Sequence, residues 1–236
     1  MEIYGIIAAM QEEMYEIEKI MGEKENIKIH ELNFIKGKIN DKTVVLVEAG
    51  VGKVNAARTT QILIDKFEVN SIINVGSAGS ANDKLDIGDI VIGKKVVQHD
   101  FDITAFGHPK GYISNVGAFL ESDEKLIERM QQTILKINDK NFNILVGTIA
   151  SGDIFCTDIN MKDKIRKKFN ADAIEMEGAA IAQVCKLDSI PFIIIRGISD
   201  KPNGKNEITF DQFLKQASKR CAEIIKEFLH NGQLKK

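Results

Sequence analysis

One run of residues, PFIIIR at positions 191–196, constrains the fold more than any other feature of this chain. A strand with one face in water alternates apolar and polar residues, whereas a strand apolar at every position is covered on both faces. Several short runs share this character, which predicts a sheet between two layers of helices. The expected strands are Ile3–Ala9, Thr43–Glu48, Ser71–Val75, Asp89–Val97, Phe142–Ile149, Ala173–Glu175 and Pro191–Arg196.

Amphipathic segments of helical period separate these strands. They are Gln11–Met21, Val54–Phe67, Asp123–Ile137, Met161–Phe169, Ala179–Lys186 and Phe210–Leu229. Alternation of strand and helix predicts a mostly parallel sheet. The stretch Glu31–Asn40 and the strand after it instead suggest a hairpin that turns at Asn40-Asp41, so the sheet is expected to be mixed. With no linker or repeat in view, we expect residues 1–236 to form one three-layer α/β domain.

Charge and cysteine content exclude several classes of function. The net charge of −2 gives no reason to expect nucleic acid or a membrane surface as a partner. The basic residues of 162–168 are interpreted as a solvated helix face. The odd number of widely spaced cysteines (Cys156, Cys185 and Cys221) favours a reducing compartment. No stretch resembles a signal peptide or a span of about 20 apolar residues. A soluble cytoplasmic protein is expected.

The chemistry is expected where the strands end. In open α/β sheets ligands bind at the carboxyl ends of the strands. Here those ends are polar or rich in glycine, whereas the strand bodies are apolar, which predicts one composite pocket. The ends read AAMQEE (8–13), GSAG (76–79), SGDIF (151–155), EMEG (175–178) and RGISD (196–200).

Carboxylates at these ends are the candidate acids and bases. Glu13 opens a helix, where the helix dipole favours an acidic residue by itself, so that reading is preferred for Glu13 alone. Glu175 and Glu177 flank Met176, and strand alternation points both to one side, where like charges need an answering group. For Asp200 a turn residue and a catalytic acid are equally supported. Glu13 and Asp200 together would form a base-and-acid pair across a scissile bond.

Glycine, histidine and cysteine motifs argue against other chemistries. Neither the stretch 50–53 nor GSAG fits a P-loop or a dinucleotide fingerprint, which disfavours a nucleotide cofactor. His99 lies near Asp100 and Asp102, but no second cluster has the spacing of metal ligands, so a structural or ribose-side role is preferred. Nothing near Cys156 marks it as a thiolate nucleophile.

Seven ordered blocks carry a family resemblance over nearly the whole chain. They are GIIAAMQEEM, EAGVGKVNAA, NVGSAGS, FDITAFGH, SGDIF, IEMEGAAIAQVC and RGISD. In this order and spacing they resemble the 5′-methylthioadenosine/S-adenosylhomocysteine nucleosidase family. The resemblance implies a nucleoside phosphorylase-like fold and a homodimer, with no metal or cofactor. It implies hydrolysis of these nucleosides, and of 5′-deoxyadenosine, to adenine and the 5′-substituted ribose, in methionine salvage and recycling of S-adenosylmethionine by-products.

The resemblance also implies residue roles. Glu13 would activate the attacking water, and Asp200 would protonate adenine N7. Glu177 would hold the ribose hydroxyls, with Met176 against the sugar. The other implied contacts are Phe155 stacked on adenine, the Cys156 backbone at its edge, Ser77 and Arg196 near ribose and water, and Met10, Val51, Ile103, Phe106 and Phe210 around the 5′-alkylthio group, some from the partner subunit.

Three alternatives stay open. A purine nucleoside phosphorylase needs cations for phosphate, and the first strand end and the GSAG block hold no arginine. A nucleosidase for 6-amino-6-deoxyfutalosine would share these motifs and differ at the 5′ pocket. A non-catalytic nucleoside-binding protein would not need Glu13, Glu177 and Asp200 together.

Overall fold

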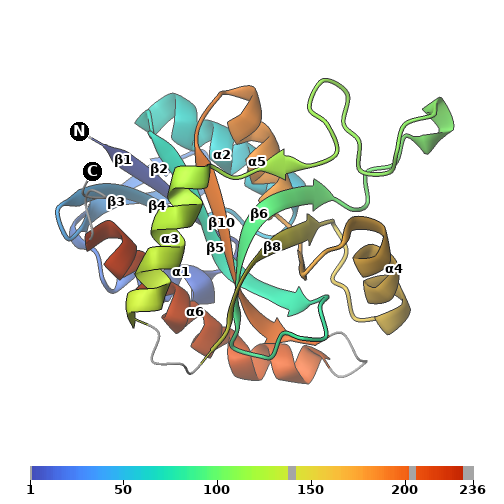
Figure 1. Cartoon of the computed structure of the whole chain (residues 1–236). Helices are drawn as coiled ribbons and strands as arrows, with labels where there is room; N and C mark the ends of the chain where they lie inside the picture. The colour runs from blue at the N-terminus through green and yellow to red at the C-terminus, as the bar shows by residue number, and fades with distance from the viewer. Residues whose placement is uncertain (1, 138–141, 202–205, 231–236) are drawn as a thin grey trace.

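In the computed structural model, a mixed β-sheet lies between two groups of helices (Figure 1). The structure describes residues 2–137, 142–201 and 206–230, with side chains from residue 213 onward in the last stretch. The described strands are β1 (Ile3–Ala8), β2 (Gly22–Ile29), β3 (Leu32–Ile39), β4 (Lys42–Glu48), β5 (Ser71–Ser80), β6 (Ile90–Gln98), β7 (Leu120–Glu121), β8 (Ile144–Ser151), β9 (Ala173–Glu175) and β10 (Phe192–Asp200). The helices are α1 (Gln11–Glu18), α2 (Lys53–Phe67), α3 (Glu124–Ile137), α4 (Ile159–Phe169), α5 (Gly178–Leu187) and α6 (Asn206–His230), with a 3-10 turn, η1 (Thr104–Phe106).

The strand order is β10-β6-β8-β9-β5-β1-β4-β3-β2, and β10 also pairs with β5. The five strands β5, β10, β6, β8 and β9 therefore close into a ring, from which β1, β4, β3 and β2 extend. β1, β4, β5 and β10 run parallel, so their carboxyl ends share one edge. The hairpin expected at Asn40-Asp41 is confirmed, because β3 and β4 are antiparallel neighbours and Asn40 has a φ of 54°.

Both faces of the central strands are buried, as the PFIIIR run predicts. Ile193 and Ile195 lie in the cluster that includes the buried side of α1, α3 and α6. Ile194 lies in the opposite cluster, with α2 and α5. Each of these isoleucines is fully buried, and burial of such a side chain contributes roughly 2 kcal/mol to folding. The central strands that carry the carboxyl edge are therefore packed on both faces.

Several expectations about local structure are wrong. β5 continues through GSAG to Ser80, and β10 continues through Asp200, because strand pairing between them extends past their apolar bodies. β2 was not expected, since its sequence GEKENIKI has no apolar run, and it is an exposed edge strand. Lys162 is not solvated: its ammonium lies 2.9 Å from Asp83 and 3.2 Å from Asp163, and the residue is 7% exposed.

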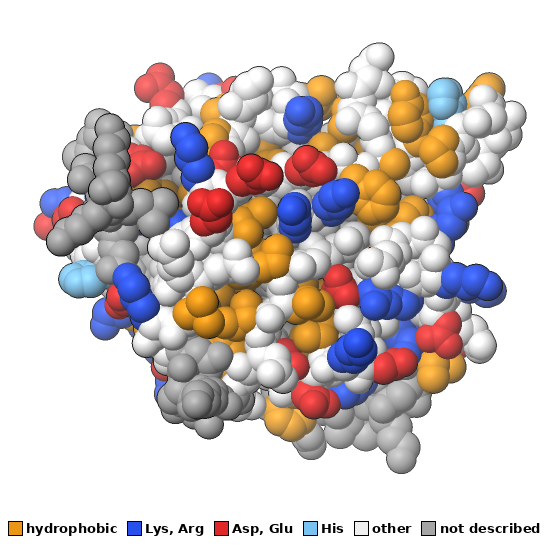
Figure 2. All heavy atoms as spheres, in the orientation of Figure 1, with side chains coloured by type: hydrophobic (Ala, Val, Ile, Leu, Met, Phe, Trp, Pro, Cys, Tyr) orange, Lys and Arg blue, Asp and Glu red, His pale blue; other side chains and the backbone are white. Residues whose placement is uncertain are grey.

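A long arm joins β6 to β7 and carries η1 away from the body of the molecule (Figure 1). Figure 2 shows acidic, basic and apolar side chains interspersed on the face seen in Figure 1. No described helix has both the length and the apolar composition needed to cross a membrane.

Candidate active site

A cavity of about 510 Å³ opens at the carboxyl ends of the parallel strands β1, β5 and β10, beside β9, which is antiparallel to β5. It brings together most of the residues that the sequence predicted, from four strand ends, α1 and the loop before α2. Its lining consists of Ala9, Met10, Glu13, Val51, Ser77, Ala78, Gly79, Phe155, Ile174, Glu175, Met176, Glu177, Arg196 and Asp200. Cys156 lines a narrower hollow that shares Phe155, Met176 and Asp200 with it.

Glu13 is held by four hydrogen-bond donors. Its Oε2 accepts from the backbone N–H groups of Ala9 at 3.0 Å and Met10 at 3.3 Å. Its Oε1 accepts from the N–H of Ser77 at 2.8 Å and from Ser77 Oγ at 3.0 Å. The residue caps the start of α1 and is only 3% exposed. The expected place of Glu13 at the start of the helix is confirmed, and the same side chain also lines the cavity.

Arg196 carries the positive charge of the cavity. It is 1% exposed, and its Nη2 binds Asn74 Oδ1 at 2.6 Å and the carboxylate of Glu175. Its Nη1 donates to the Ser77 carbonyl at 3.4 Å. The sequence segments beside GSAG hold no arginine, but β10 brings this one to that place. Carboxylates surround it, so its charge is already matched.

Glu177 lies on the other side of Arg196, 3.6 Å from Nη2. Its Oε1 accepts a 2.8 Å hydrogen bond from the backbone N–H of Gly52. Burial raises the pKa of Glu177 to about 7; the charge of Glu175 adds to this rise and Arg196 opposes it. The expected need for an answering group beside Glu175 and Glu177 is therefore met by Arg196.

Asp200 is the last residue of β10 and is 1% exposed. It pairs with Gly79 of β5 after an irregularity in register at Ile198, and such a bulge re-aims a side chain. Ser199 Oγ donates to Asp200 Oδ1 at 2.9 Å. Since the strand continues through this residue, its reading as a turn residue is wrong.

The remaining lining is apolar or aromatic. Phe155 and Val51 are 44% and 46% exposed, so each presents a face to the cavity or to solvent. Burial raises the pKa of the Cys156 thiol to about 11, which keeps it protonated near neutral pH. His99 is buried against Gly152 and does not line the cavity. Within the described residues, no cluster of His, Cys, Asp and Glu could hold a metal ion.

Two predicted contacts do not lie at this cavity, and a third falls on a side chain that the structure does not describe. Ile103 and Phe106 lie on the arm, outside the cavity lining, and Phe106 is 81% exposed. The side chain of Phe210 lies outside the described residues. Alternation along EME singled out Glu175 together with Glu177 in the sequence, but gave Glu175 no specific role. The Gly52 N–H was missed, because a backbone donor leaves no signal in the sequence.

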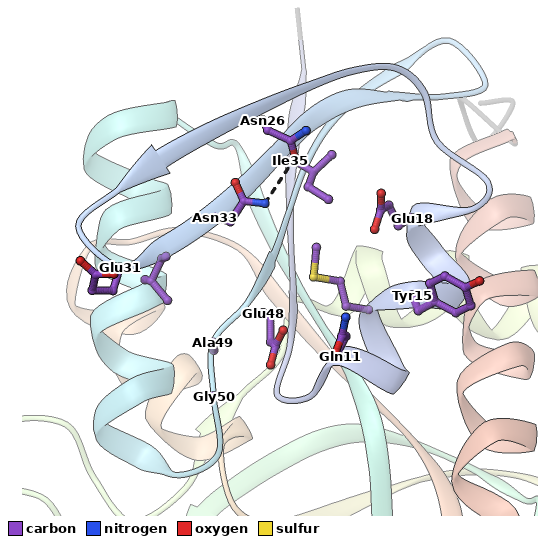
Figure 3. A pocket seen from close by; sticks show the side chains of 12 residues that line it. Gln11, Tyr15, Glu18, Asn26, Glu31, Asn33, Ile35, Glu48, Ala49 and Gly50 are labelled. Carbon is purple, nitrogen blue, oxygen red and sulfur yellow. Dashed lines mark hydrogen bonds between the residues drawn. The ribbon is translucent and has the colours of Figure 1, made fainter.

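A second cavity, of about 490 Å³, lies between α1, the β2–β3 hairpin and the end of β4 (Figure 3). Glu48 and Gln11 stand at one end, and Asn26 and Asn33 bond to each other at 3.3 Å across the hairpin (Figure 3). None of the predicted site residues lines it. The two cavities are similar in size, so the buried carboxylates and arginine of the first distinguish the candidate active site.

Known proteins resemble this chain over almost its full length. The family model described as phosphorylase superfamily matches residues 3–230. The 5′-methylthioadenosine/S-adenosylhomocysteine nucleosidase of Staphylococcus haemolyticus (strain JCSC1435) is 40% identical over 226 residues, which are 95% of this chain and 98% of that protein. The solved nucleosidase of the same description from Colwellia psychrerythraea 34H, in complex with adenine, has a TM-score of 0.93 at 34% identity, covering 97% of this chain and 95% of its own. Futalosine hydrolase of Helicobacter pylori strain 26695 has a TM-score of 0.93 at 32% identity, covering 98% of both chains.

Proposed function

We propose residue roles for this site from one premise: the chain belongs to the phosphorylase superfamily and, within it, to the 5′-methylthioadenosine/S-adenosylhomocysteine nucleosidases. It is an N-glycosyl hydrolase that releases adenine from 5′-methylthioadenosine and S-adenosylhomocysteine and leaves the 5′-substituted ribose. One observation carries the roles. Glu13 and Asp200 both contact β5, because Ser77 of β5 donates a hydrogen bond to Glu13 and Gly79 of β5 pairs with Asp200.

Two residues along a strand span about 7 Å, which leaves room for a scissile bond between base and acid. Glu13 accepts a proton from water, and Ser77 keeps its carboxylate in place. Asp200 protonates N7 of the leaving adenine. When adenine leaves, positive charge develops on the ribose ring. The negative charges of Glu13, Glu175 and Glu177 exceed the single positive charge of Arg196, so the site favours the positively charged ribose.

Recognition of the nucleoside follows from the same lining. Glu177 accepts hydrogen bonds from the ribose hydroxyls, and Met176 packs on the sugar. Phe155 stacks on adenine, and the Cys156 backbone bonds to the edge of that base. Ser77 and Arg196 frame the water site. This arrangement gives hydrolysis over phosphorolysis, because Arg196 is matched by Glu175 and Glu177 and has no charge left for phosphate.

The 5′ substituent needs an apolar pocket, of which Met10 and Val51 form one wall. We propose that Ile103 and Phe106 of a second copy complete it, since the arm holds Phe106 81% exposed and away from its own cavity. Phe210 would close the same pocket. The protein would then act as a homodimer of single-domain chains (1–236), in the cytoplasm, in methionine salvage and by-product recycling.

A second substrate has specific support. The similarity to a futalosine hydrolase favours 6-amino-6-deoxyfutalosine as an additional substrate. This nucleoside differs from methylthioadenosine in its 5′ substituent.

The deciding experiment supplies the protein with methylthioadenosine in phosphate-free buffer and measures free adenine. Stoichiometric adenine and 5-methylthioribose are expected, with no change when phosphate is added. Formation of a ribose 1-phosphate that depends on phosphate would contradict hydrolysis. Parallel assays with S-adenosylhomocysteine and 6-amino-6-deoxyfutalosine rank the substrates.

A further inference from the structure

Glu175 is a buried carboxylate at the edge of the cavity, and the steps above use only its negative charge. It ends β9, is 6% exposed and lines the cavity beside Met176 and Glu177. A buried charge is costly unless it is answered by donors. Its partners therefore indicate what it does.

One carboxylate of Glu175 joins three elements. Its Oε2 accepts from Arg196 Nη2 of β10, and from the backbone N–H groups of Glu177 at 3.1 Å and Gly178 at 2.8 Å, where α5 begins. Its Oε1 accepts from Ser151 Oγ at the end of β8. Ser151 Oγ in turn accepts from the N–H of Ala179 at 2.7 Å. The first turn of α5 is thus held to β8 and β10 through Glu175.

Glu177 depends on this arrangement in two ways. Its backbone N–H is bound by Glu175, which sets the direction in which its side chain leaves the chain. Its carboxylate faces Arg196 of β10, Glu175 of β9 and Glu13 of α1, and accepts from the Gly52 N–H before α2. The negative charge of Glu175 raises the pKa of Glu177, while the arginine that Glu175 holds lowers it.

We propose that Glu175 is a positioning residue for the nucleosidase reaction: it orients Glu177 and Arg196 toward the ribose and controls the charge on Glu177. This inference rests on the proposed function, in which Glu177 binds the ribose hydroxyls. Glu175 itself need not touch the nucleoside.

The test compares Glu175→Gln, Glu175→Asp and a matched control, Asp172→Asn. Asp172 is also buried, at 8% exposed, and also binds an arginine, with Arg166 Nη1 at 2.7 Å, but it lies outside the cavity lining. At pH 8.5, where Glu177 is charged, Glu175→Gln is expected to raise KM for methylthioadenosine roughly tenfold and to lower kcat less than about threefold. Asp172→Asn is expected to leave both within about twofold.

The pH profile separates positioning from simple loss of stability. Glu175→Gln removes a negative charge beside Glu177 and leaves Arg196 to interact with Glu177, and both changes lower the pKa of Glu177. The acid limb of the kcat/KM profile is therefore expected to shift to lower pH by about one unit. Glu175→Asp keeps the charge and is expected to raise KM with the limb unmoved. An unmoved limb in Glu175→Gln, or equal effects in Asp172→Asn, would overturn the proposal.

Binding measurements keep the outcome distinct from failure of the reaction itself. A C-nucleoside analogue of adenosine, whose glycosidic bond resists hydrolysis, is expected to bind Glu175→Gln about tenfold more weakly, whereas free adenine binds equally well. If wild-type protein released no adenine, the proposed function would fail first. Should Glu175→Gln not fold, Ser151→Ala removes one donor to Glu175 and is expected to raise KM about threefold; an unchanged KM there would count against the proposal.

Discussion

The backbone N–H of Gly52 donates a 2.8 Å hydrogen bond to Glu177 Oε1, across 125 residues of sequence. Gly52 has a φ of 98°, and a Cβ added there would lie 3.1 Å from Asp153 Oδ1. Asp153 in turn accepts from the N–H of Lys53, and the Lys53 ammonium lies 2.7 Å from Asp100 at the base of the arm. The start of α2 therefore ties the proposed ribose site to the arm.

Gly52→Ala is expected to weaken ribose recognition. The positive φ is strained for any side chain by about 1–2 kcal/mol, and relief of that strain moves the N–H away from Glu177. We expect KM for methylthioadenosine to rise about tenfold and the melting temperature to fall. Gly117→Ala is the control, because Gly117 has a φ of 105° and an added Cβ there would meet only the Phe119 carbonyl oxygen, at 4.0 Å. An equal rise in KM for both variants would contradict the assignment.

The raised pKa of Glu177, about 7, predicts the pH dependence of activity. A charged carboxylate accepts hydrogen bonds from both ribose hydroxyls, whereas a protonated carboxyl accepts fewer hydrogen bonds. Below about pH 7, kcat/KM should therefore fall up to tenfold per pH unit. A rate profile from pH 5 to 9 measures this limb. A limb near pH 4.5 would contradict it.

The same residue predicts a stability change of known sign. Because the pKa of Glu177 in the folded protein lies above the ordinary glutamate value of 4.5, its charged form disfavours folding. That cost is absent below pH 4.5 and complete above about pH 7. Glu177→Gln should therefore raise the free energy of unfolding at pH 8, by on the order of 2–3 kcal/mol, with little gain at pH 4.5. Urea unfolding at the two values tests this, and equal gains at both would refute it.

Asp200→Asn removes the proposed proton donor and preserves the shape of the side chain. Loss of a general acid should lower kcat by about 10²–10⁴-fold, while the C-nucleoside analogue binds with little change. Single-turnover release of adenine measures the step. Ser199→Ala, which removes the hydroxyl bound to Asp200, should have a much smaller effect. Unchanged turnover in Asp200→Asn would exclude this residue as the acid.

Gly76→Ala tests how Glu13 is held without altering Glu13. A Cβ at Gly76 would lie 2.8 Å from Glu13 Oε1 and would overlap Arg196 Nη1. Both side chains must shift, so kcat should fall by at least about 100-fold. Glu13→Gln should match or exceed that loss. Full activity in Gly76→Ala would show that the position of Glu13 does not matter.

The partner contribution of the arm can be tested by complementation. Phe106→Ala should raise KM for methylthioadenosine by up to about 30-fold, as loss of an apolar contact of about 2 kcal/mol implies, and should affect adenosine less. Mixed dimers of Phe106→Ala and Asp200→Asn chains hold one site with both residues intact. They should regain activity that neither variant has alone. Sedimentation of a monomer, or no recovery, would refute the shared site.

The sequence by itself determined the layers, most of the strands and the candidate acids and bases. Apolar runs such as PFIIIR require burial on both faces, and this requirement is local in the chain. The family resemblance rested on short motifs, and the comparisons confirm the family and the fold. Strand ends were less certain, because pairing of β5 with β10 carries both strands into segments that look like loops.

Only the tertiary structure decided which groups meet. Arg196 reaches the GSAG segment from β10, and Gly52 reaches Glu177 from the start of α2. Neither meeting follows from residue type or spacing, since each joins segments more than a hundred positions apart. The pKa of Glu177 has the same origin, because burial and the charges of Glu175 and Arg196 exist only once the chain is folded.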